Sequence, residues 1–369
     1  MSQLIEDRLD RSVQQCALMA SSLQNLPDRL PRSIDATGAL VTSDSKWWCS
    51  GFFSGSLWYL YEYQPSQTVL ADARHYTMRV EQEKYNKGTH DLGFMLYCSF
   101  GNGYRLTGDT AYRNVMLIGA ESLSNRFNPQ VGCIQSWNAS PKWQFPVIID
   151  NMMNLEFLFW ASKVSGNPKY REICISHADK TIENHFRPDY SSYHVVSYDP
   201  VSGQVEKKNT AQGYNDESAW GRGQAWGLYG FTVMYRETQD AKYLEQAKNI
   251  ARFIIGHPNL PADKIPYWDF NAPEIPNTKR DASAGAIIAS ALIELSGYVD
   301  KSLAKTYLSV AETQIRTLSS PEYFAATGDN GNFILKHSIG TFLRNSEVDV
   351  PLTYADYYYI EALLRYKSL

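Results

Sequence analysis

A short signature recurs along the chain and constrains the fold more than any other feature. In each copy a Gly or a polar residue ends one helical pattern, Asp or Asn caps the next, and Tyr follows about one turn later. The copies are "RLTGDTAYRNVML", "KVSGNPKYREICI", "RETQDAKYLEQAK" and the looser "GYVDKSLAKTYLSVA". The chain is therefore predicted to consist of repeated helical hairpins.

The two helices of each hairpin differ in their apolar pattern. Segments such as "DLGFMLYCSFGNGYR", "NMMNLEFLFWASK" and "AWGLYGFTVMYR" are apolar nearly all round, whereas "KYLEQAKNIARFI" is apolar on one side only. Helices of the first kind are buried, and those of the second kind face water. We therefore predict an all-α toroid, in which an outer ring of helices wraps an inner ring. About six hairpins would use up the chain, so residues 1–369 are expected to form a single domain.

One segment departs from the helical pattern. "YHVVSYDPVSGQVEKKNTAQGY" alternates apolar and polar residues around "DPVSG", which predicts a small β-hairpin. It lies in a long connection that runs from about Pro188 to Ser218. Long connections in compact domains are often functional.

Charge and composition exclude several classes of partner. The net charge is −4 without a run of Lys or Arg, which argues against nucleic acid and anionic membranes. No apolar run reaches membrane-spanning length. The first residues, "MSQLIEDRLDRSVQQCALMASSL", carry acids as well as bases and do not resemble a secretory signal. We expect a cytoplasmic protein, or a periplasmic one if a signal peptide has been removed.

Cysteine and histidine spacing gives no metal or redox motif. The five cysteines are widely spaced, with no C-x-x-C, as is typical of buried free thiols in a reducing compartment. The seven histidines include no H-E-x-x-H and no close pair. No metal and no organic cofactor are expected.

Two isolated aspartates stand at the start of apolar helical patterns. Asp150 lies in "FPVIIDNMMNLEFLFWASK", and Asp91 opens a segment with no further charge until Arg105. Either residue could simply cap its helix. Alternatively, a carboxylate surrounded by apolar neighbours has a raised pKa and can donate a proton near neutral pH. Two such groups could flank one sugar.

Aromatic and polar residues elsewhere could complete a sugar site. In "ESAWGRGQAWGLYGF" the glycines around Arg222 cost helix propensity but allow close approach, and Arg222 could hold a carboxylate or hydroxyl. The alternative is two core tryptophans and a surface arginine. His194 and Gln212 bracket the β-hairpin and could hold a water, although a structural role for His194 is an equal alternative. The remaining candidates are Trp48, Trp137, Trp220, Trp226 and His90, beside Asp91.

Several blocks together resemble a known enzyme family. They are "SGFFSGSLWYLYEY", "HDLGFMLYCSFGNGYRLTGD", "IIDNMMNLEFLFWAS", "ESAWGRGQAWGLYGFTVMYRET", "RDASAGAIIASAL" and "SEVDVPLTYADYYYIEALLRY". In this order they resemble the unsaturated glucuronyl hydrolases of glycoside hydrolase family 88, over roughly residues 46–366. The resemblance implies an (α/α)6 barrel. It also implies removal of a 4,5-unsaturated uronic acid from the non-reducing end of oligosaccharides made by polysaccharide lyases.

The resemblance also assigns roles to the candidate residues. Asp150 would protonate C4 of the enol ether and then accept a proton from the water that adds at C5. Asp91 would hold sugar hydroxyls and face the developing cation. His194 and Gln212 would position the water or the substrate carboxylate, and Arg222 would hold polar groups of the uronate. Trp48, Trp137 and Trp226 would line the subsite of the unsaturated sugar.

Two other functions are compatible with the sequence. One is an unsaturated rhamnogalacturonyl hydrolase, which shares the Tyr-Ala-Asp-Tyr block more loosely. The other is a carbohydrate-binding toroid without turnover, for which replacing Asp150 would change nothing measurable. The expected partner is an unsaturated oligosaccharide, and the protein is expected to be a monomer or weak homodimer.

Overall fold

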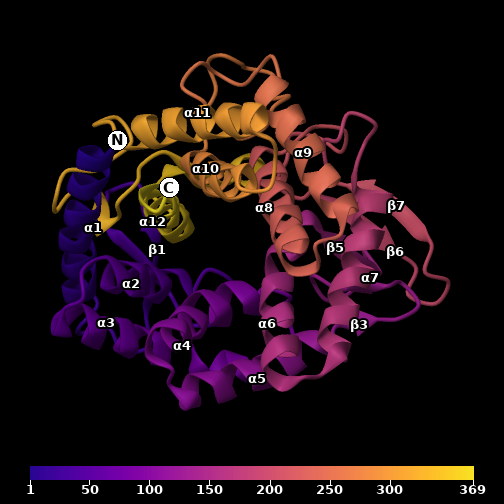
Figure 1. The fold of residues 1–369 in the computed structure, drawn as a ribbon, viewed down its shortest axis with the longest axis horizontal. Coiled ribbons are helices and arrows are strands. Elements are labelled where there is room, and N and C mark those ends of the chain that lie inside the picture. Colours follow the sequence, from indigo (N-terminus) through magenta and orange to yellow (C-terminus); the bar gives the residue numbers. More distant parts are fainter.

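The computed structural model describes residues 1–369, and its helices form two concentric rings (Figure 1). Each inner helix contacts its inner neighbours, and an outer helix packs behind it. The inner ring comprises α2 (Phe52–Tyr63), η2 (Gly93–Gly101) with α4 (Asn102–Thr107), η3 (Ile149–Asn154) with α6 (Leu155–Ser165), α8 (Gly221–Thr238), α10 (Ala282–Ser296) and α12 (Thr353–Lys367). The outer ring comprises α1 (Ser2–Ser22), α3 (Gln67–Met78), α5 (Thr110–Ser124), α7 (Pro168–His185), α9 (Ala241–Gly256) and α11 (Lys301–Leu318).

The two ends of the chain close the ring. The last helix, α12, contacts α10 on one side and α2 on the other, and α1 packs against both α12 and α2. The sixth hairpin is therefore made of the first and last helices. This arrangement confirms the predicted all-α (α/α)6 barrel.

The repeated turns have the predicted backbone geometry. Gly108, Gly166 and Gln239 each end a helix in the left-handed region, with φ of 69°, 71° and 57°. The residue that follows each of them, Asp or Asn, accepts a backbone N–H from the next helix through its side chain. In the looser fourth copy Asp300 caps α11 in the same way, but Gly297 stays right-handed, with φ of −73°.

The tyrosine of each signature is buried, and two of the four link neighbouring helices of the outer ring. The Tyr170 hydroxyl on α7 donates to Glu121 Oε2 on α5 at 3.0 Å. The Tyr243 hydroxyl on α9 donates to Asp179 Oδ1 on α7 at 2.8 Å. Each of these bonds joins one outer helix to the preceding one.

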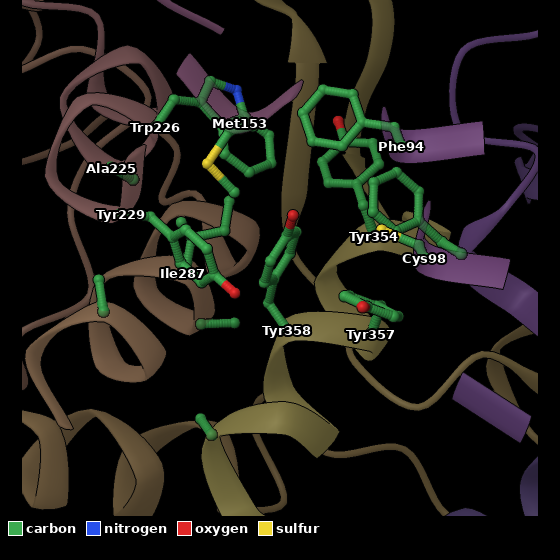
Figure 2. Close-up of a cluster of buried hydrophobic side chains, with 14 of the residues drawn as sticks. Phe94, Cys98, Met153, Ala225, Trp226, Tyr229, Ile287, Tyr354, Tyr357 and Tyr358 are labelled. Carbon is green, nitrogen blue, oxygen red and sulfur yellow. The ribbon is translucent and has the colours of Figure 1, made fainter. Parts of the chain in front are cut away.

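The axis of the barrel is filled with side chains. Every residue of α10 except Glu294 is buried, whereas α9 buries one face only. One cluster of 87 buried residues includes side chains from both rings. At its centre the Trp226 ring lies 5.2 Å from Phe94 and 5.4 Å from Tyr358, each contributed by a different inner helix (Figure 2).

Two inner helices do not begin as regular α-helices. After Asp91 the chain forms η2, a π-helix, and Asp150 lies in η3, a 3-10 helix. The two segments touch, because the Phe94 N–H donates to Asn154 Oδ1 at 3.2 Å. A Cβ at Gly93 would lie 2.8 Å from Asn154 Cα, so only glycine allows this approach. The segment after Asp91 therefore lies against the segment that contains Asp150.

The small sheets lie in the connections between helices. The predicted hairpin is present as β6 (Val195–Tyr198) and β7 (Val205–Asn209), and β5 (Phe145–Ile148) adds an unpredicted third strand beside β6. β8 (Ser338–Thr341) pairs with β9 (Ser346–Val350) in the connection before α12. The remaining pairs are β1 (Leu30–Ile34) with β2 (Leu40–Ser43) and β3 (Phe127–Asn128) with β4 (Cys133–Ile134).

Two further features were predicted from composition. All five cysteines are buried and free, as expected. None of the helices combines the length and the apolar character needed to span a bilayer.

Candidate active site

A cavity of about 470 Å³ opens where the inner helices begin. It contains four of the predicted site residues, Trp48, Trp137, Gln212 and Arg222. The other residues that line it are Trp47, Asn138, Ser140, Trp143, Ala211, Gly340, Thr341, Arg344, Ser346, Glu347 and Tyr354.

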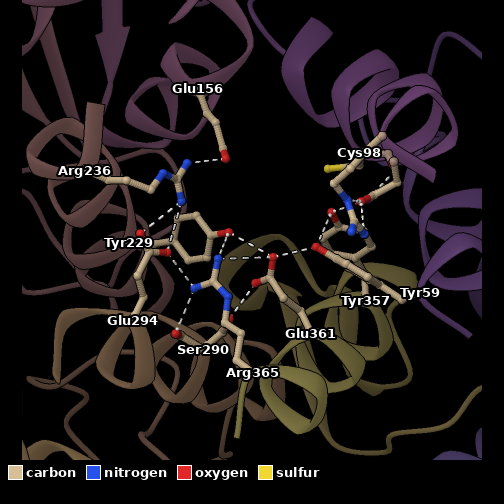
Figure 3. Close-up of polar contacts among 12 residues, drawn as sticks. Tyr59, Cys98, Glu156, Tyr229, Arg236, Ser290, Glu294, Tyr357, Glu361 and Arg365 are labelled. Carbon is tan, nitrogen blue, oxygen red and sulfur yellow. Dashed lines mark hydrogen bonds and ion pairs between the residues drawn. The ribbon is translucent and has the colours of Figure 1, made fainter. Parts of the chain in front are cut away.

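The opposite end of the barrel holds a second cavity of about 380 Å³, but its charged groups are paired (Figure 3). The Glu361 carboxylate accepts from the Tyr59 hydroxyl at 2.7 Å and from the Tyr229 hydroxyl at 3.0 Å. Arg365 pairs with Glu294 at 2.9 Å. These groups satisfy one another and form a structural network, so the first cavity is the better candidate for chemistry.

Strand pairing places Asp150 beside His194. Ile148 at the end of β5 pairs with Val195 at the start of β6, and the Ile149 N–H donates to the His194 carbonyl at 3.1 Å. Asp150 Oδ2 consequently lies 3.7 Å from His194 Nε2. Neither atom has a hydrogen-bond partner in the protein. The gap is too long for a direct hydrogen bond, and a water or a substrate group can bridge it.

The environment of Asp150 favours its protonated form. The pKa of this carboxyl is raised to about 7, chiefly by burial; the positive Arg222 opposes this rise and the negative charge of Asp91 adds to it. Asp150 does not cap a helix, because Ile148 occupies that position of η3 and no side chain caps it. The capping interpretation is therefore wrong for Asp150, and the carboxyl is a competent proton donor near neutral pH.

His194 is held in one tautomer. Its Nδ1 accepts the backbone N–H groups of Ala211 at 3.1 Å and Gln212 at 3.2 Å, so the neutral ring carries its proton on Nε2, facing Asp150. Burial lowers the pKa of His194 well below its usual value and keeps the ring neutral. Trp220 packs against the ring with centroids 4.4 Å apart. The β-hairpin and the loop after it therefore orient an N–H donor at the acid.

Asp91 is held by its neighbours in sequence. The Thr89 hydroxyl donates to Oδ2, and His90 Nε2 lies 3.2 Å from Oδ1. Burial lowers the pKa of His90, so its ring is neutral. The side chains of Asp91 and Asp150 are 13% and 12% exposed, and neither lines the wall of the cavity. Both carboxyls therefore keep a limited access to solvent.

Arg222 is a buried residue of the cavity wall. Its guanidinium donates to Asp281 Oδ2 at 3.1 Å, to the Gly340 carbonyl at 3.0 Å and to the Ile339 carbonyl. The flanking glycines are needed here, because a Cβ at Gly221 would lie 2.6 Å from the Tyr267 carbonyl oxygen. The alternative of a surface arginine is therefore wrong.

Like the two aspartates and His194, the predicted residues Trp226, Trp220 and His90 do not line the cavity. Trp226 is fully buried against Phe94 and Tyr358, so the expectation that it lines the sugar subsite is not met in this structure. Its indole N–H makes no hydrogen bond of normal geometry, but the polar interaction of this group with the Asp150 carboxylate lowers the pKa of Asp150. Trp220 and His90 are also buried, and they contact His194 and Asp91 respectively. Trp220 and His90 therefore help to hold His194 and Asp91 in place.

Part of the cavity wall was not predicted from the sequence. Trp143 packs on Trp137 with centroids 5.3 Å apart, and Tyr354 at the start of α12 packs on Trp48 at 4.7 Å. The tryptophans in the stretches "WW" and "KWQ" could have indicated an aromatic wall. In the β8–β9 segment the alternation of polar and apolar residues in "SEVDV" was a weak signal for a strand.

A two-ring helical barrel with an aromatic and arginine-lined cavity and a protonatable buried aspartate defines a carbohydrate-processing enzyme. The comparison with known families agrees, since the Glycosyl Hydrolase Family 88 model matches residues 25–367. The chain belongs to glycoside hydrolase family 88 and is a hydrolase of the unsaturated glucuronyl hydrolase type.

Relatives support this placement over the whole chain. An unsaturated glucuronyl hydrolase of Formosa agariphila is 46% identical over 93% of this chain and 86% of its own. The crystal structure of an unsaturated glucuronyl hydrolase specific for heparin is 49% identical and superposes with a TM-score of 0.97, covering 100% of this chain and 98% of the other. A variant of the Streptococcus agalactiae enzyme, solved in complex with dGlcA-GalNAc6S, is 27% identical with a TM-score of 0.82, covering 98% and 91%.

Proposed function

We propose that this protein releases a 4,5-unsaturated uronic acid from the non-reducing end of glycosaminoglycan-type oligosaccharides produced by polysaccharide lyases. The observation that carries the proposal is the buried Asp150, whose carboxyl is protonated near neutral pH beside the Nε2–H of His194. The relatives support the substrate class, because one is described as specific for heparin and another binds an unsaturated sulfated disaccharide.

The first chemical step is the transfer of the Asp150 proton to C4 of the enol ether. The C4=C5 electrons form the new C–H bond, and C5 gains oxocarbenium character that the ring oxygen shares. A neutral acid serves this step better than a carboxylate, which explains why Asp150 lies among apolar residues. The charge of Asp91 then stabilises the developing cation.

Water addition completes the reaction. Once ionised, Asp150 accepts a proton from the water that attacks C5, and the space between its Oδ2 and His194 Nε2 suits that water. The resulting C5 hemiketal breaks its bond to the ring oxygen and becomes a ketone. The open-chain hemiacetal at C1 then expels the rest of the oligosaccharide. One water molecule is consumed overall, and the acid is regenerated.

The cavity wall supplies recognition of the sugar. We assign Arg222 and Gln212 to polar groups of the uronate, since both lie in the wall and Gln212 Nε2 donates to the same Gly340 carbonyl as Arg222. Trp48 and Trp137 provide flat apolar surfaces for the sugar rings. Asp91 is assigned to sugar hydroxyls.

The conjugated enoate absorbs ultraviolet light, and its hydration destroys that band. The protein is mixed with unsaturated disaccharides from heparin, chondroitin and hyaluronan, with and without sulfate, and with unsaturated galacturonyl-rhamnose. We expect the glucuronyl substrates to lose the band. Turnover of galacturonyl-rhamnose alone would favour the rhamnogalacturonyl alternative, and binding of the sugars without turnover would favour the binding toroid.

The Asp150→Asn variant tests the assignment of the acid in the same assay. We expect it to retain substrate binding and to lose about 10³-fold in kcat, or about 4 kcal/mol of transition-state stabilisation. Near-normal turnover by this variant would show that another group donates the proton.

We further propose that the protein acts in the cytoplasm as a monomer or weak homodimer. Five buried free thiols suit a reducing compartment. Cell fractionation and light scattering of the purified protein test the two statements separately.

A further inference from the structure

Asp281 is a fully buried carboxylate outside the proposed chemistry. It caps α10, where Oδ1 accepts the Ser283 N–H at 3.0 Å and the Ser283 hydroxyl at 2.6 Å. Its Oδ2 accepts from Arg222 at 3.1 Å, and the two side chains are 0% and 2% exposed. Because water screens this ion pair little, its charges interact strongly with neighbouring ionisable groups.

The same carboxylate joins Arg222 to the cavity wall. The Ile339 N–H reaches Asp281 Oδ1 at 3.4 Å, while the carbonyls of Ile339 and Gly340 on β8 accept from the Arg222 guanidinium. Gly340 in turn accepts from Gln212 at 3.0 Å. Asp281 therefore fixes the orientation of Arg222 and one edge of the wall together.

Arg222 interacts with two acids that differ in the protonation state they need: Asp281 is its ion-pair partner, whereas Asp150 has to keep its proton. It interacts electrostatically with Asp281 and with Asp150, and Tyr354 on α12 packs over it. The groups that face Asp150 from the surrounding elements are Arg222 and Trp226 from α8, Asp91 before η2, and His194 at β6. His90, beside Asp91, is neutral, and Arg344 and Glu347 belong to the cavity wall.

Among these groups Arg222 carries the positive charge that acts most on Asp150. Left uncompensated, this charge would favour ionised Asp150 and remove the proton needed for catalysis. The Asp281 carboxylate, 3.1 Å from Arg222 in a buried ion pair, is placed to offset this charge.

We propose that Asp281 is a positioning residue for the reaction: it aims Arg222 at the cavity and balances its charge, so that Arg222 can receive an anionic sugar while Asp150 keeps its proton. The inference rests on the proposed function for its catalytic meaning. Its electrostatic part is a property of the folded protein alone and can be tested without substrate.

The Asp281→Asn variant removes the charge and keeps the helix cap, because Asn caps a helix as well as Asp does. The basic limb of kcat/KM against pH should move to lower pH by at least one unit. Activity at pH 7.5 should fall at least about sevenfold, while activity at pH 5.5 stays within about threefold of wild type, because Asp150 remains mostly protonated there. Asp300→Asn is the matched control, since Asp300 caps α11 on the outer ring in the same way, and it should keep the wild-type limb. An unmoved limb in Asp281→Asn would overturn the proposal.

A substrate-free measurement separates this inference from the proposed function. Carbon-13 NMR of aspartate-labelled protein follows the Asp150 carboxyl, whose signal is assigned by its absence in Asp150→Asn. The titration midpoint should fall by at least one unit in Asp281→Asn.

The Arg222→Met/Asp281→Asn double variant leaves no unpaired charge and guards against misfolding of the single variant. Its midpoint should return to the wild-type value or rise above it, and a lowered midpoint there would contradict the proposal. Absence of turnover by wild type on every sugar would refute the proposed function and leave the NMR result intact.

Discussion

At the scale of single residues, the chemistry depends on how the protein sets the acidity of one carboxyl. Asp150 sits among apolar residues of η3 with its Oδ2 unpaired, and burial brings its pKa to about 7. The neighbouring histidines His177, His185 and His194 all have lowered pKa values because they are buried, so they add no positive charge near neutral pH. The value of about 7 already includes the opposite effects of the positive Arg222, which lowers the pKa, and of the negative Asp91, which raises it.

Replacing Asp91 with Asn tests this balance. Removing its negative charge should lower the pKa of Asp150, because ionised Asp150 is then repelled less. The basic limb of the kcat/KM profile should shift to lower pH, together with a loss of maximal rate from weaker cation stabilisation. A limb that stays in place or moves to higher pH would show that Asp91 does not act electrostatically on Asp150.

At the scale of elements, the site depends on the contact between two irregular helical segments. The π-helix η2 and the 3-10 helix η3 approach closely at Gly93, where a Cβ would lie 2.6 Å from Asn154 Oδ1 and 2.8 Å from its Cα. This contact brings the segment after Asp91 against the segment that contains Asp150. Irregular helical turns of this kind are frequent at functional sites.

Gly93→Ala should push these two segments apart. Because the clash involves backbone atoms of Asn154, we expect a loss of about 1–3 kcal/mol in the free energy of unfolding and at least a tenfold loss of activity. Chemical denaturation and the ultraviolet assay measure the two effects. Gly256→Ala at the end of α9 is the control, since a Cβ there meets nothing within 4 Å. Equal behaviour of the two variants would contradict the role of the Gly93 contact.

Local sequence signals and long-range contacts differ in how well they could be predicted. The turns at Gly108 and Gly166 were predictable because their residues cap helices through neighbours in sequence. The burial of Asp150 followed from its apolar neighbours. Its contact with His194 could not be predicted from spacing, because it arises from the pairing of β5 with β6 across two intervening helices. The prediction that Trp226 lines the cavity was wrong, because on a helix that is apolar all round the sequence does not show which aromatic side chain reaches the cavity.

At the scale of the whole molecule, the ring is closed by helices from the two ends of the chain. α1 and α12 pack together, and Gln15 on α1 donates to the carbonyls of Asp329 and Phe333 in the connection before β8. Asp356 on α12 accepts the N–H groups of Ile334 and Leu335 in that same connection. The closure therefore also holds the segment that leads to the cavity wall.

The stability of this closed ring should depend on the protonation of Asp150. In the folded protein the carboxyl keeps its proton up to about pH 7, whereas in the unfolded chain it ionises near its ordinary pKa of 3.8. Its contribution to stability is therefore full below that value and is lost as pH rises to about 7. Asp150→Asn should be more stable than wild type at pH 8, by up to about 4 kcal/mol, and the difference should shrink towards pH 4.

Thermal and denaturant unfolding at both pH values measure this difference. The control is Asp28→Asn, at an exposed position with left-handed backbone that Asn tolerates. It should change stability little at either pH. A variant at position 150 that is less stable than wild type at pH 8 would contradict the burial of an ionisable acid there.

The most direct test of the central claim is the pH dependence of kcat/KM for the wild-type enzyme, followed by loss of the ultraviolet band of an unsaturated disaccharide. If protonated Asp150 delivers the proton to C4, the value should stay high below about pH 7 and then fall about tenfold for each further pH unit. A profile that stays flat from pH 5 to pH 9, or that rises through pH 7, would show that a protonated carboxyl is not the catalyst.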